Sequence, residues 1–341
     1  MKDSINIAIA GATGYIGLEL IKILLKHPIV NIKYLCATKS IGKSIYSFDK
    51  KINKKKLPNI TKVNNINWNN VDVLFTALPN GEAHKIANFL HSKTKLIDLS
   101  ADFRLKDTKV YRKWYGIKHK SKKMIPKSIY SVAEFSKKII KNYKIISCPG
   151  CYPTSVQLPL IPLIKKNLIN TNNIIIDSKS GYSGAGRNIK KKFNIKNLNN
   201  SVRAYGVGSH RHMVEIDQEL SKAARKKVNV SFTPHLIPMF RGILSTIYLD
   251  TRKGGNAKII YNFLKKYHKN NFFVKIAKFN KPINTGDVMN TNFCQISVCK
   301  NRKENKIIII SAIDNLIKGG SGQAVQNMNL AFNIKETSGL L

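Results

Sequence analysis

The sequence predicts a two-domain α/β protein, with a helix-covered parallel sheet in its first half and a more antiparallel α+β domain in its second half. Up to about residue 150, short apolar runs alternate with helical or loop segments, which is the pattern of a parallel sheet. A glycine-rich turn joins the first apolar run to the first helix. Beyond Cys151, strand-like runs follow one another with only two or three helices between them. These three observations place the domain boundary near residue 150.

The first half is expected to hold five strands. Residues 5–10 form an apolar run that ends in glycines, and apolar residues at helical spacing follow between residues 18 and 25. The polar segment 50–70 is rich in Lys and Asn and has little periodicity, so we interpret it as an insertion or surface loop. The other four expected strands cover residues 32–37, 71–78, 95–99 and 143–147.

The second half predicts six more strands. An apolar helix should follow Cys151, another should cover residues 214–224, and residues 323–332 predict a last helix that packs back on the first domain. No internal repeat is visible. The expected strands cover residues 174–177, 228–233, 244–250, 272–275, 293–298 and 307–312.

Size and charge limit the class of protein. The 341 residues are 43% hydrophobic, which supports a sizeable core and excludes disordered, collagen-like and small disulfide-stabilised chains. The 59 Lys and Arg against 18 Asp and Glu give a net charge of +41 and suggest nucleic acid as a partner. Only nine of these cations are Arg, the residue that reads bases by bidentate contacts, and the Lys are scattered. Drift in an A/T-rich genome is the competing explanation, and a nucleic-acid partner is not expected. The lysine runs at 54–56, 190–192 and 265–266 are interpreted as solvated surface.

No apolar stretch reaches the roughly 18 residues of a membrane span. The chain runs from Met1 almost directly into an apolar strand, so we expect no signal peptide, no membrane partner and a cytoplasmic location. The five cysteines are few and odd in number, which argues against a disulfide framework and leaves thiol chemistry open. They are Cys36, Cys148, Cys151, Cys294 and Cys299.

The glycine-rich turn GATGYIG, residues 11–17, predicts a dinucleotide site of the Rossmann type. Glycines let the backbone approach a pyrophosphate, and the N–H groups at the start of the following helix meet its charge. The second strand ends in Thr38, Lys39 and Ser40 rather than in Asp or Glu, and hydroxyls with a cation favour a 2′-phosphate, hence NADP(H). The expected cofactor residues of the turn are Gly11, Thr13, Gly14, Tyr15, Ile16 and Gly17.

The pair Cys148 and Cys151 has three interpretations. Half of a zinc site would need a second ligand pair, which is missing nearby, so no metal is expected, and a thioredoxin-type pair would lie elsewhere in the chain. Cys151 instead follows a strand and a Pro-Gly turn and precedes an apolar helix, where the helix dipole favours a thiolate. We interpret it as a single nucleophile and take Cys36, Cys294 and Cys299 as buried and inert.

A proton shuttle for such a thiolate could come from His210 and His212, just before the helix 214–224. In extended backbone both side chains project to the same side, and Glu215 could orient one of them. A surface loop that happens to carry two histidines is the alternative. The glycine-rich stretch 180–187, with Arg187, and the segment around Arg241 are candidate anion sites, although such loops are often plain turns.

Taken together, these motifs closely resemble the N-acetyl-gamma-glutamyl-phosphate reductase family over nearly the whole chain. The resemblance implies a Rossmann domain at 1–150, completed by the C-terminal helix within 318–341. It also implies an α+β catalytic and oligomerisation domain at 151–317, like those of aspartate-semialdehyde and glyceraldehyde-phosphate dehydrogenases. The motifs are GATGYIG (11–17), LSADFRL (99–105), PGCYPT (149–154), SGAGR (183–187), HRH (210–212), PMFRGIL (238–244) and DNLIKGGSGQAVQN (314–327).

The resemblance implies a reaction and roles for residues. NADPH would reduce N-acetylglutamyl 5-phosphate to the 5-semialdehyde in arginine biosynthesis, through a thioester on Cys151 with an acid/base from the histidine pair. Ser183, Gly184 and Asn315 would contact the cofactor. The anchors of the anionic substrate would be Arg104, Arg187 and Arg241.

Some positions depart from the family pattern, and other functions stay open. Asn80 stands where the family commonly has His, Cys148 is unusual at its position, and Met213-Val214 replaces a Thr-Pro type pair. The alternatives are a reductase of carrier-protein-bound amino-acid phosphates, an aspartate-semialdehyde dehydrogenase, and a basic NADP-binding regulator of nucleic acid. A homodimer or homotetramer is expected from the resemblance.

Overall fold

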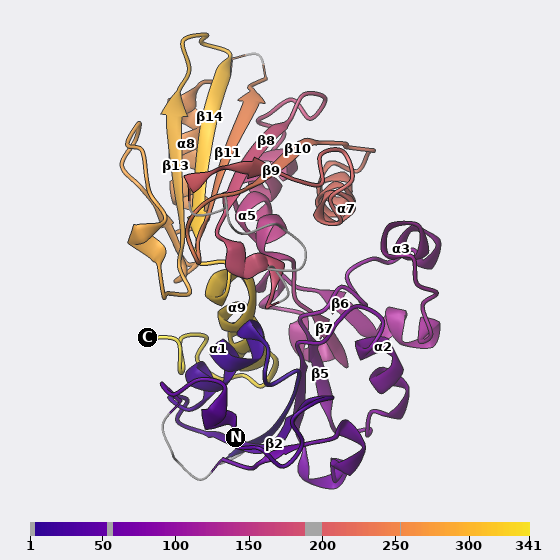
Figure 1. Cartoon of the computed structure of the whole chain (residues 1–341). Helices are drawn as coiled ribbons and strands as arrows, with labels where there is room; N and C mark the ends of the chain where they lie inside the picture. The colour runs from indigo at the N-terminus through magenta and orange to yellow at the C-terminus, as the bar shows by residue number, and fades with distance from the viewer. Residues whose placement is uncertain (1–3, 53–56, 188–199, 253) are drawn as a thin grey trace. The chain divides into compact units, whose positions relative to one another are not determined.

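The computed structural model describes residues 4–52, 57–187, 200–252 and 254–341, and the chain divides into two compact units (Figure 1). Unit 1 comprises Met1–Pro149 and Gly320–Leu341, and unit 2 comprises Gly150–Gly319. Each unit contains one seven-stranded sheet. Of the three lysine runs expected at the surface, those at 54–56 and 190–192 lie outside the described residues, whereas Lys265 and Lys266 are exposed.

The sheet of unit 1 is parallel throughout, as the alternation of strands and helices predicts. Its strands pair in the order β3-β2-β1-β4-β5-β7-β6. The five expected strands are present, with ends within two residues of the predicted ones, whereas β3 and β6 were not predicted. The strands are β1 (Ile5–Ala10), β2 (Val30–Cys36), β3 (Ile60–Thr61), β4 (Val73–Thr76), β5 (Lys95–Asp98), β6 (Ser128–Tyr130) and β7 (Ile145–Ser147).

The interpretation of residues 50–70 as a surface loop is wrong in part. Ile60 and Thr61 form the edge strand β3 against β2, and Ile52, Ile60 and Ile66 are buried. Widely spaced apolar residues in a polar segment give no periodic signal, but each one fills a gap at the edge of the core. The segment therefore extends the sheet by one short strand.

The two faces of β1 are covered by different elements of unit 1. Ile5, Ile7 and Ile9 are buried in one cluster with apolar residues of helices α1 (Tyr15–Leu24) and α9 (Gly322–Ala331), whereas Ala8 and Ala10 belong to a second cluster. Successive side chains of a strand point to opposite faces, and here both faces are buried, so β1 is a continuous apolar run. The other helices of unit 1 are α2 (Ala83–Ile86), α3 (Thr108–Tyr115) and α4 (Ala133–Ser136).

The chain that follows α9 is fastened by the side chain of Asn329. Its Nδ2 donates to the carbonyl oxygens of Glu336 (3.3 Å) and Ser338 (3.0 Å), and its Oδ1 lies 3.0 Å from Nε2 of His27. Lys137 forms an ion pair with Glu336 at 2.8 Å. Helix α9 itself packs on α1 and β5. The C-terminal segment is thus an integral part of unit 1.

The sheet of unit 2 is mixed, with four antiparallel and two parallel pairs in the order β12-β13-β14-β11-β8-β10-β9. The six expected strands are present with ends within three residues, and the two-residue β9 was not predicted. The seven strands are β8 (Ile175–Ser180), β9 (Arg203–Ala204), β10 (Ser231–Leu236), β11 (Ile243–Asp250), β12 (Val274–Ile276), β13 (Cys294–Lys300) and β14 (Lys306–Ile313).

Helices cover one face of this sheet. Helix α5 (Cys151–Lys165) packs on β11 and β14, α8 (Ala257–Tyr267) packs on β13, and α7 (His212–Ala224) packs beside α5. On the other face, Leu244, Thr246 and Tyr248 alternate along β11 and stay partly exposed, as do Ile308 and Ile310 of β14. None of the helices in the described part of the chain has the length and apolar character of a membrane span.

Candidate active site

The glycines of the first turn are required by close backbone contacts. Gly11 has a φ of +89°, and a Cβ added there would lie 2.3 Å from the carbonyl oxygen of Ala77, just beyond β4. A Cβ on Gly17 would lie 2.2 Å from the carbonyl oxygen of Gly11. The N–H of Gly11 donates to the carbonyl of Cys36 at 2.9 Å, which ties the turn to the end of β2. Side chains at 11 and 17 would therefore break the turn.

The start of α1 offers main-chain donors for an anion. Helix α1 begins at Tyr15, and Gly14, in extended conformation, precedes it without a side chain that could cap the helix. The first N–H groups of a helix have no intrahelical acceptor and bind phosphates well. The turn lies where the order of the sheet reverses between β2 and β4, the usual ligand position in such sheets. Thr38 and Lys39 are exposed on the chain after β2, at the same edge.

Asp102 binds main-chain N–H groups of the loop after β4. This residue was not predicted from the sequence. Its Oδ1 accepts from the N–H of Gly81 (2.7 Å) and the hydroxyl of Tyr111 (2.7 Å), and its Oδ2 accepts from the N–H of His84 (3.1 Å). Asp102 is fully buried. The carboxylate therefore fixes the loop that contains Asn80, where the chain departs from the family pattern.

Arg104, a candidate substrate anchor, is hydrogen-bonded to main-chain carbonyls. Its guanidinium is buried, with Nε donating to the carbonyl of Cys148 (2.8 Å) and Nη2 to that of Leu99 (3.0 Å). These bonds hold the main chain that leads into Pro149. A direct contact of Arg104 with substrate stays a prediction, whereas its positioning contacts are visible.

Cys151 lies at the first position of α5, as the sequence predicts. Gly150 precedes the helix in extended conformation, and Cys151 is half-buried. The other member of the pair, Cys148, is fully buried, and burial raises the pKa of its thiol to about 12. Burial also raises the pKa of the Cys36 thiol to about 12. All five cysteines are free thiols, and Cys299 is half-buried rather than buried.

The expectation of extended backbone at the two histidines is wrong, because His212 is helical, but both rings lie together beside Tyr152. Helix α7 begins at His212, two residues before the predicted start, and Arg211 already has helical dihedrals. The helical turn instead lets the N–H of His212 donate to Nδ1 of His210 at 3.1 Å. The ring centroids of His210 and His212 are 4.8 Å apart.

The ring of His212 covers the residue that precedes Cys151. A Cβ added to Gly150 would lie 2.4 Å from Nε2 of His212, so only glycine leaves room for the imidazole. The carboxylate of Glu215, one turn further along α7, accepts from the N–H of Gly150 at 2.7 Å. Glu215 was expected to orient a histidine; its visible partner is the Gly150 amide, and an effect on a histidine stays a prediction.

His210 lies in an aromatic cluster. Its ring meets those of Tyr152, Tyr205 and Phe232 edge to face, with centroids 5.6, 5.4 and 5.6 Å away. The hydroxyls of Tyr152 and Tyr205 are 3.0 Å apart. Burial, with a smaller contribution from the Arg211 cation, lowers the pKa of His210 to about 4. His210 is therefore a neutral ring near pH 7.

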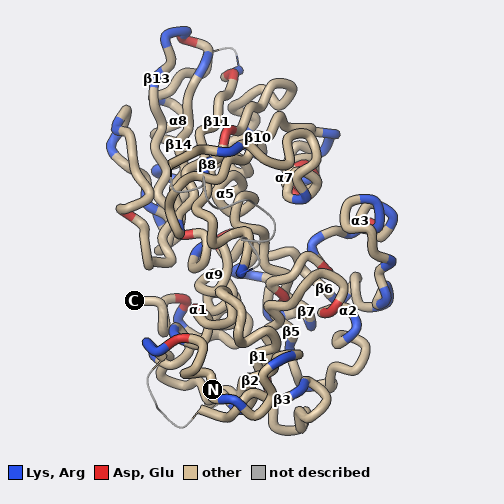
Figure 2. The backbone as a smooth tube through the Cα atoms, in the orientation of Figure 1, with Lys and Arg blue, Asp and Glu red and all other residues tan. Residues whose placement is uncertain are grey.

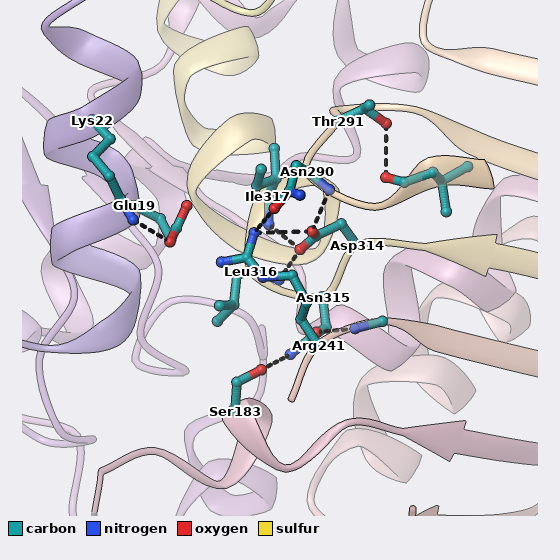
Figure 3. A network of polar contacts seen from close by, with 12 residues as sticks. Glu19, Lys22, Ser183, Arg241, Asn290, Thr291, Asp314, Asn315, Leu316 and Ile317 are labelled. Carbon is teal, nitrogen blue, oxygen red and sulfur yellow. Dashed lines mark hydrogen bonds and ion pairs between the residues drawn. The ribbon is translucent and has the colours of Figure 1, made fainter. Parts of the chain in front are cut away.

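A second cluster in unit 2 joins three other predicted residues (Figure 3). Arg241 pairs through Nη1 with the buried Asp314 (3.2 Å) and donates to Oδ1 of Asn290 (2.6 Å). Asn315 accepts from the N–H of Gly242 at 2.7 Å and donates to the hydroxyl of Ser183 at 3.0 Å. The Asn315 amide thereby joins the loops around Ser183 and Arg241.

Most of the predicted residues fall into three groups, and Arg104 and Arg187 lie outside them. Cys151, His210, His212 and Glu215 come together in unit 2, and the glycine turn with the chain after β2 lies in unit 1. The exposed Arg187 ends the described segment 57–187. The remaining group in unit 2 is Ser183, Gly184, Arg241 and Asn315, where a Cβ on Gly184 would lie 3.6 Å from the Asn315 amide nitrogen.

Comparison with known families matches the two units separately. A family model described as "Semialdehyde dehydrogenase, NAD binding domain" matches residues 6–143. A second, described as "Semialdehyde dehydrogenase, dimerisation domain", matches residues 151–315. The first match covers the glycine turn and the parallel sheet apart from β7 and the first residue of β1, and the second begins at Cys151.

Curated relatives match over nearly the full length. A protein of Ehrlichia canis (strain Jake), "N-acetyl-gamma-glutamyl-phosphate reductase", is 42% identical over 338 residues, which are 98% of this chain and 97% of the relative. A protein of Oryza sativa subsp. japonica, "Probable N-acetyl-gamma-glutamyl-phosphate reductase, chloroplastic", is 42% identical over 99% of this chain and 81% of the relative.

Solved structures share the fold at low identity. The crystal structure of aspartate semialdehyde dehydrogenase II from Vibrio cholerae has a TM-score of 0.73 at 19% identity and covers 97% of this chain and 99% of that chain. Aspartate semialdehyde dehydrogenase with NADP from Candida albicans has a TM-score of 0.72 at 16% identity, covering 97% and 100%. At these identities the likeness establishes the fold alone.

Proposed function

This chain belongs to the N-acetyl-gamma-glutamyl-phosphate reductase family, and from that premise we propose how its residues carry out the reaction. The chain is an oxidoreductase that acts on an acyl phosphate. It converts N-acetyl-L-glutamyl 5-phosphate to N-acetyl-L-glutamate 5-semialdehyde and phosphate in arginine biosynthesis. The observation that carries the proposal is the placement of Cys151 at a helix N-terminus, next to the residue that the His212 ring covers.

Unit 1 binds a nicotinamide cofactor, and the proposal specifies NADP(H). The turn around Gly11, with its close backbone contacts, and the start of α1 would hold the pyrophosphate. The exposed Thr38 and Lys39, followed by Ser40, would meet the 2′-phosphate with hydroxyls and a cation. When bound, the nicotinamide supplies a hydride to the acyl carbon.

Cys151 is proposed as the nucleophile. Its position at the start of α5 favours the thiolate, because the helix dipole stabilises negative charge there. The thiolate attacks the acyl carbon, the bond from that carbon to the phosphate oxygen breaks, and phosphate leaves. The product of this step is a thioester on Cys151. N–H groups at the start of α5 would stabilise the oxyanion that forms during attack.

His212 rather than His210 is proposed as the acid/base. Nδ1 of His210 already accepts from the N–H of His212, and the low pKa of His210 keeps its ring neutral. His212 has its Nε2 against the residue before Cys151. It would take the thiol proton before attack, give a proton to the alkoxide formed by hydride addition, and take it back when the carbon–sulfur bond breaks. The aldehyde then leaves and the thiolate is restored.

The anionic groups of the substrate are assigned to arginines. Arg241 is proposed to bind one of these groups, because Asp314 and Asn290 already orient its guanidinium. Arg187 is exposed on the glycine-rich loop. Arg104 is proposed to act mainly by holding the chain before Pro149.

The function is tested by running the reaction in reverse, because the acyl phosphate is labile. Phosphate-dependent reduction of NADP+ by N-acetylglutamate 5-semialdehyde should be robust in the wild type and fall by about 10³-fold or more in Cys151→Ser. Cys148→Ser is the matched control, since its thiol is buried and outside the proposed chemistry. Full activity of Cys151→Ser would refute the covalent route. Activity only with a carrier-protein-bound substrate would instead favour the related carrier-dependent reductases.

A homodimer or homotetramer is also proposed. The second unit matches a dimerisation domain, and the face of its sheet opposite α5 and α8 leaves Leu244, Tyr248 and Ile308 partly exposed. A second copy would cover these apolar side chains. Sedimentation equilibrium should report an oligomer in the wild type and a shift toward monomer in Tyr248→Lys.

A further inference from the structure

The turn that follows β14 packs against Cys151 through Gly319. We propose that the segment 314–319 is a positioning device, in which Gly319 forms a wall against Cβ of Cys151 and Asp314 holds that wall in place. This inference rests on the proposed function, because it assumes that Cys151 is the nucleophile. Neither Gly319 nor Asp314 would touch the reacting atoms, so both would be positioning residues.

The contact between Gly319 and Cys151 leaves no room for a side chain. A Cβ added to Gly319 would lie 2.6 Å from Cβ and 3.1 Å from Cα of Cys151, and 3.3 Å from Cδ1 of Ile313. The φ of Gly319 is not in the left-handed range, so backbone conformation does not require glycine here. The requirement is one of space. The main chain at 319 packs against the first residue of α5 and limits where its sulfur can go.

The wall is held by a fully buried carboxylate (Figure 3). Oδ1 of Asp314 accepts from the N–H groups of Leu316 (2.9 Å) and Ile317 (3.1 Å). Oδ2 accepts from the N–H of Asn290 (2.8 Å) and pairs with Arg241 (3.2 Å). Both oxygens are thus engaged, and the turn from 314 to 317 has little freedom.

The segment forms part of a π-helix, which is unusual, and the side chain of Lys318 packs against Phe273. Gly319 lies within the π-helix Ile317–Ser321, and its N–H donates to the carbonyl of Asp314, five residues back, at 2.9 Å. Short π-helical turns occur often at functional sites. Lys318 is fully buried, and its ammonium lies 5.7 Å from the ring centroid of Phe273. Asp314 and Lys318 thus both hold the chain that leads into Gly319.

The first test replaces Gly319 with alanine. The added methyl must displace Cys151, so kcat of the semialdehyde assay should fall about 10- to 100-fold with KM changed by less than about threefold, as expected when a reacting group is misplaced by about 1 Å. The rate at which iodoacetamide modifies Cys151, followed by mass spectrometry of its peptide, should also change. A merely structural role would leave this rate unaltered in folded protein.

The matched control is Gly286→Ala. Gly286 lies in the same unit with φ outside the left-handed range, and a Cβ there would meet only the end of the flexible Asn284 side chain, at 2.8 Å. It should keep wild-type kcat and alkylation rate. If Gly319→Ala shows the same kcat and alkylation rate as Gly286→Ala, the wall does not position the thiol and the inference is wrong.

A second variant covers the case in which Gly319→Ala does not fold. Asp314→Asn keeps an oxygen for the N–H groups of Leu316 and Ile317 but loses the ion pair with Arg241. The neutral reagent iodoacetamide needs no arginine, so a changed alkylation rate at Cys151 reports on the wall and not on substrate anchoring. An unchanged rate in folded Asp314→Asn would overturn the role of Asp314.

The two proposals fail in different ways. Activity retained by Cys151→Ser would refute the nucleophile and, with it, the premise of the wall. An inactive Cys151→Ser together with a Gly319→Ala variant of wild-type kcat would refute the wall alone. A loss of kcat in both variants, with Gly286→Ala active, supports both.

Discussion

At the residue scale, Cys148 and Cys151 show that the reactivity of a thiol depends on its position in the fold. They are three residues apart, yet burial raises the pKa of the Cys148 thiol to about 12, whereas Cys151 is half-buried at the start of α5. The sequence could distinguish them because the Pro149-Gly150 turn and the apolar run that follows indicate a helix start at Cys151. It could not show the ring of His212 over Gly150, since that contact joins residues 62 positions apart.

The histidine pair allows a comparison between two neighbouring rings. His212→Asn should lower kcat by about 10²- to 10⁴-fold, the usual contribution of a general acid/base. His210→Asn keeps an oxygen near the position of Nδ1, which accepts the N–H of residue 212, and should lower kcat by about 10-fold or less. Because the pKa of His210 is about 4, its removal should leave the pH profile of kcat between pH 5.5 and 9 unaltered. A profile that shifts with His210→Asn would reverse the assignment.

We expect Asp98 to make the stability of the fold depend on pH. Burial, with the nearby Asp102, raises the pKa of this carboxyl to about 6, although Thr76 and the N–H of Ser100 both donate to it. A folded-state pKa above the unfolded value means that the stabilisation is complete below about pH 4 and is lost as pH rises through about 6. Asp98→Asn should reduce the pH dependence of thermal melts between pH 4 and 7, and Asp217, whose pKa burial also raises to about 6, should account for part of what remains. An unchanged slope in the variant would exclude Asp98 as its source.

At the element scale, long apolar runs were predictable and short elements were not. Residues 5–10 are a strand from end to end because both faces of β1 are buried, which leaves a continuous apolar signal. The two-residue strands β3 and β9 carry no period, and tertiary pairing alone creates them. The start of α7 was placed two residues late, since the polar His212 gives no apolar signal for the first turn.

The last helix and its following segment supply a stability prediction. Asn329→Ala would leave the carbonyl oxygens of Glu336 and Ser338 without their donor and would remove the contact of Nε2 of His27. Loss of a buried hydrogen-bonding group costs roughly 1–3 kcal/mol, so urea unfolding should move to lower denaturant by that free energy. The exposed Asn172→Ala is the control and should stay within about 0.5 kcal/mol. Equal stability of both variants would mean that Asn329 does not fasten the C-terminal segment.

At the scale of the whole molecule, the charge of +41 is spread widely. Figure 2 shows Lys and Arg along loops and helices of each unit, with Asp and Glu at few places. The proposed chemistry uses a handful of residues, among them three of the nine arginines, and the fifty lysines lie mostly outside the motifs. We interpret the excess as largely compositional background, with a general electrostatic effect as its one testable role.

That general effect predicts a dependence on salt. NADPH and the acyl phosphate are both anions, so a strongly positive protein attracts them over a distance that salt screens. The KM for each should rise when potassium chloride is increased from about 25 to 300 mM at constant pH, with kcat nearly constant. A flat KM over that range would leave the net charge without a role in catalysis.

The thioester on Cys151 is the central claim, and it is tested most directly by trapping it. Wild-type protein mixed with N-acetylglutamyl 5-phosphate in the absence of NADPH should gain the mass of one N-acetylglutamyl group, located on the peptide that contains Cys151, and lose it when NADPH is added. The Cys148→Ser variant should do the same, and Cys151→Ser should not. An adduct on Cys148, or no adduct in a wild-type protein that turns over, would contradict the account.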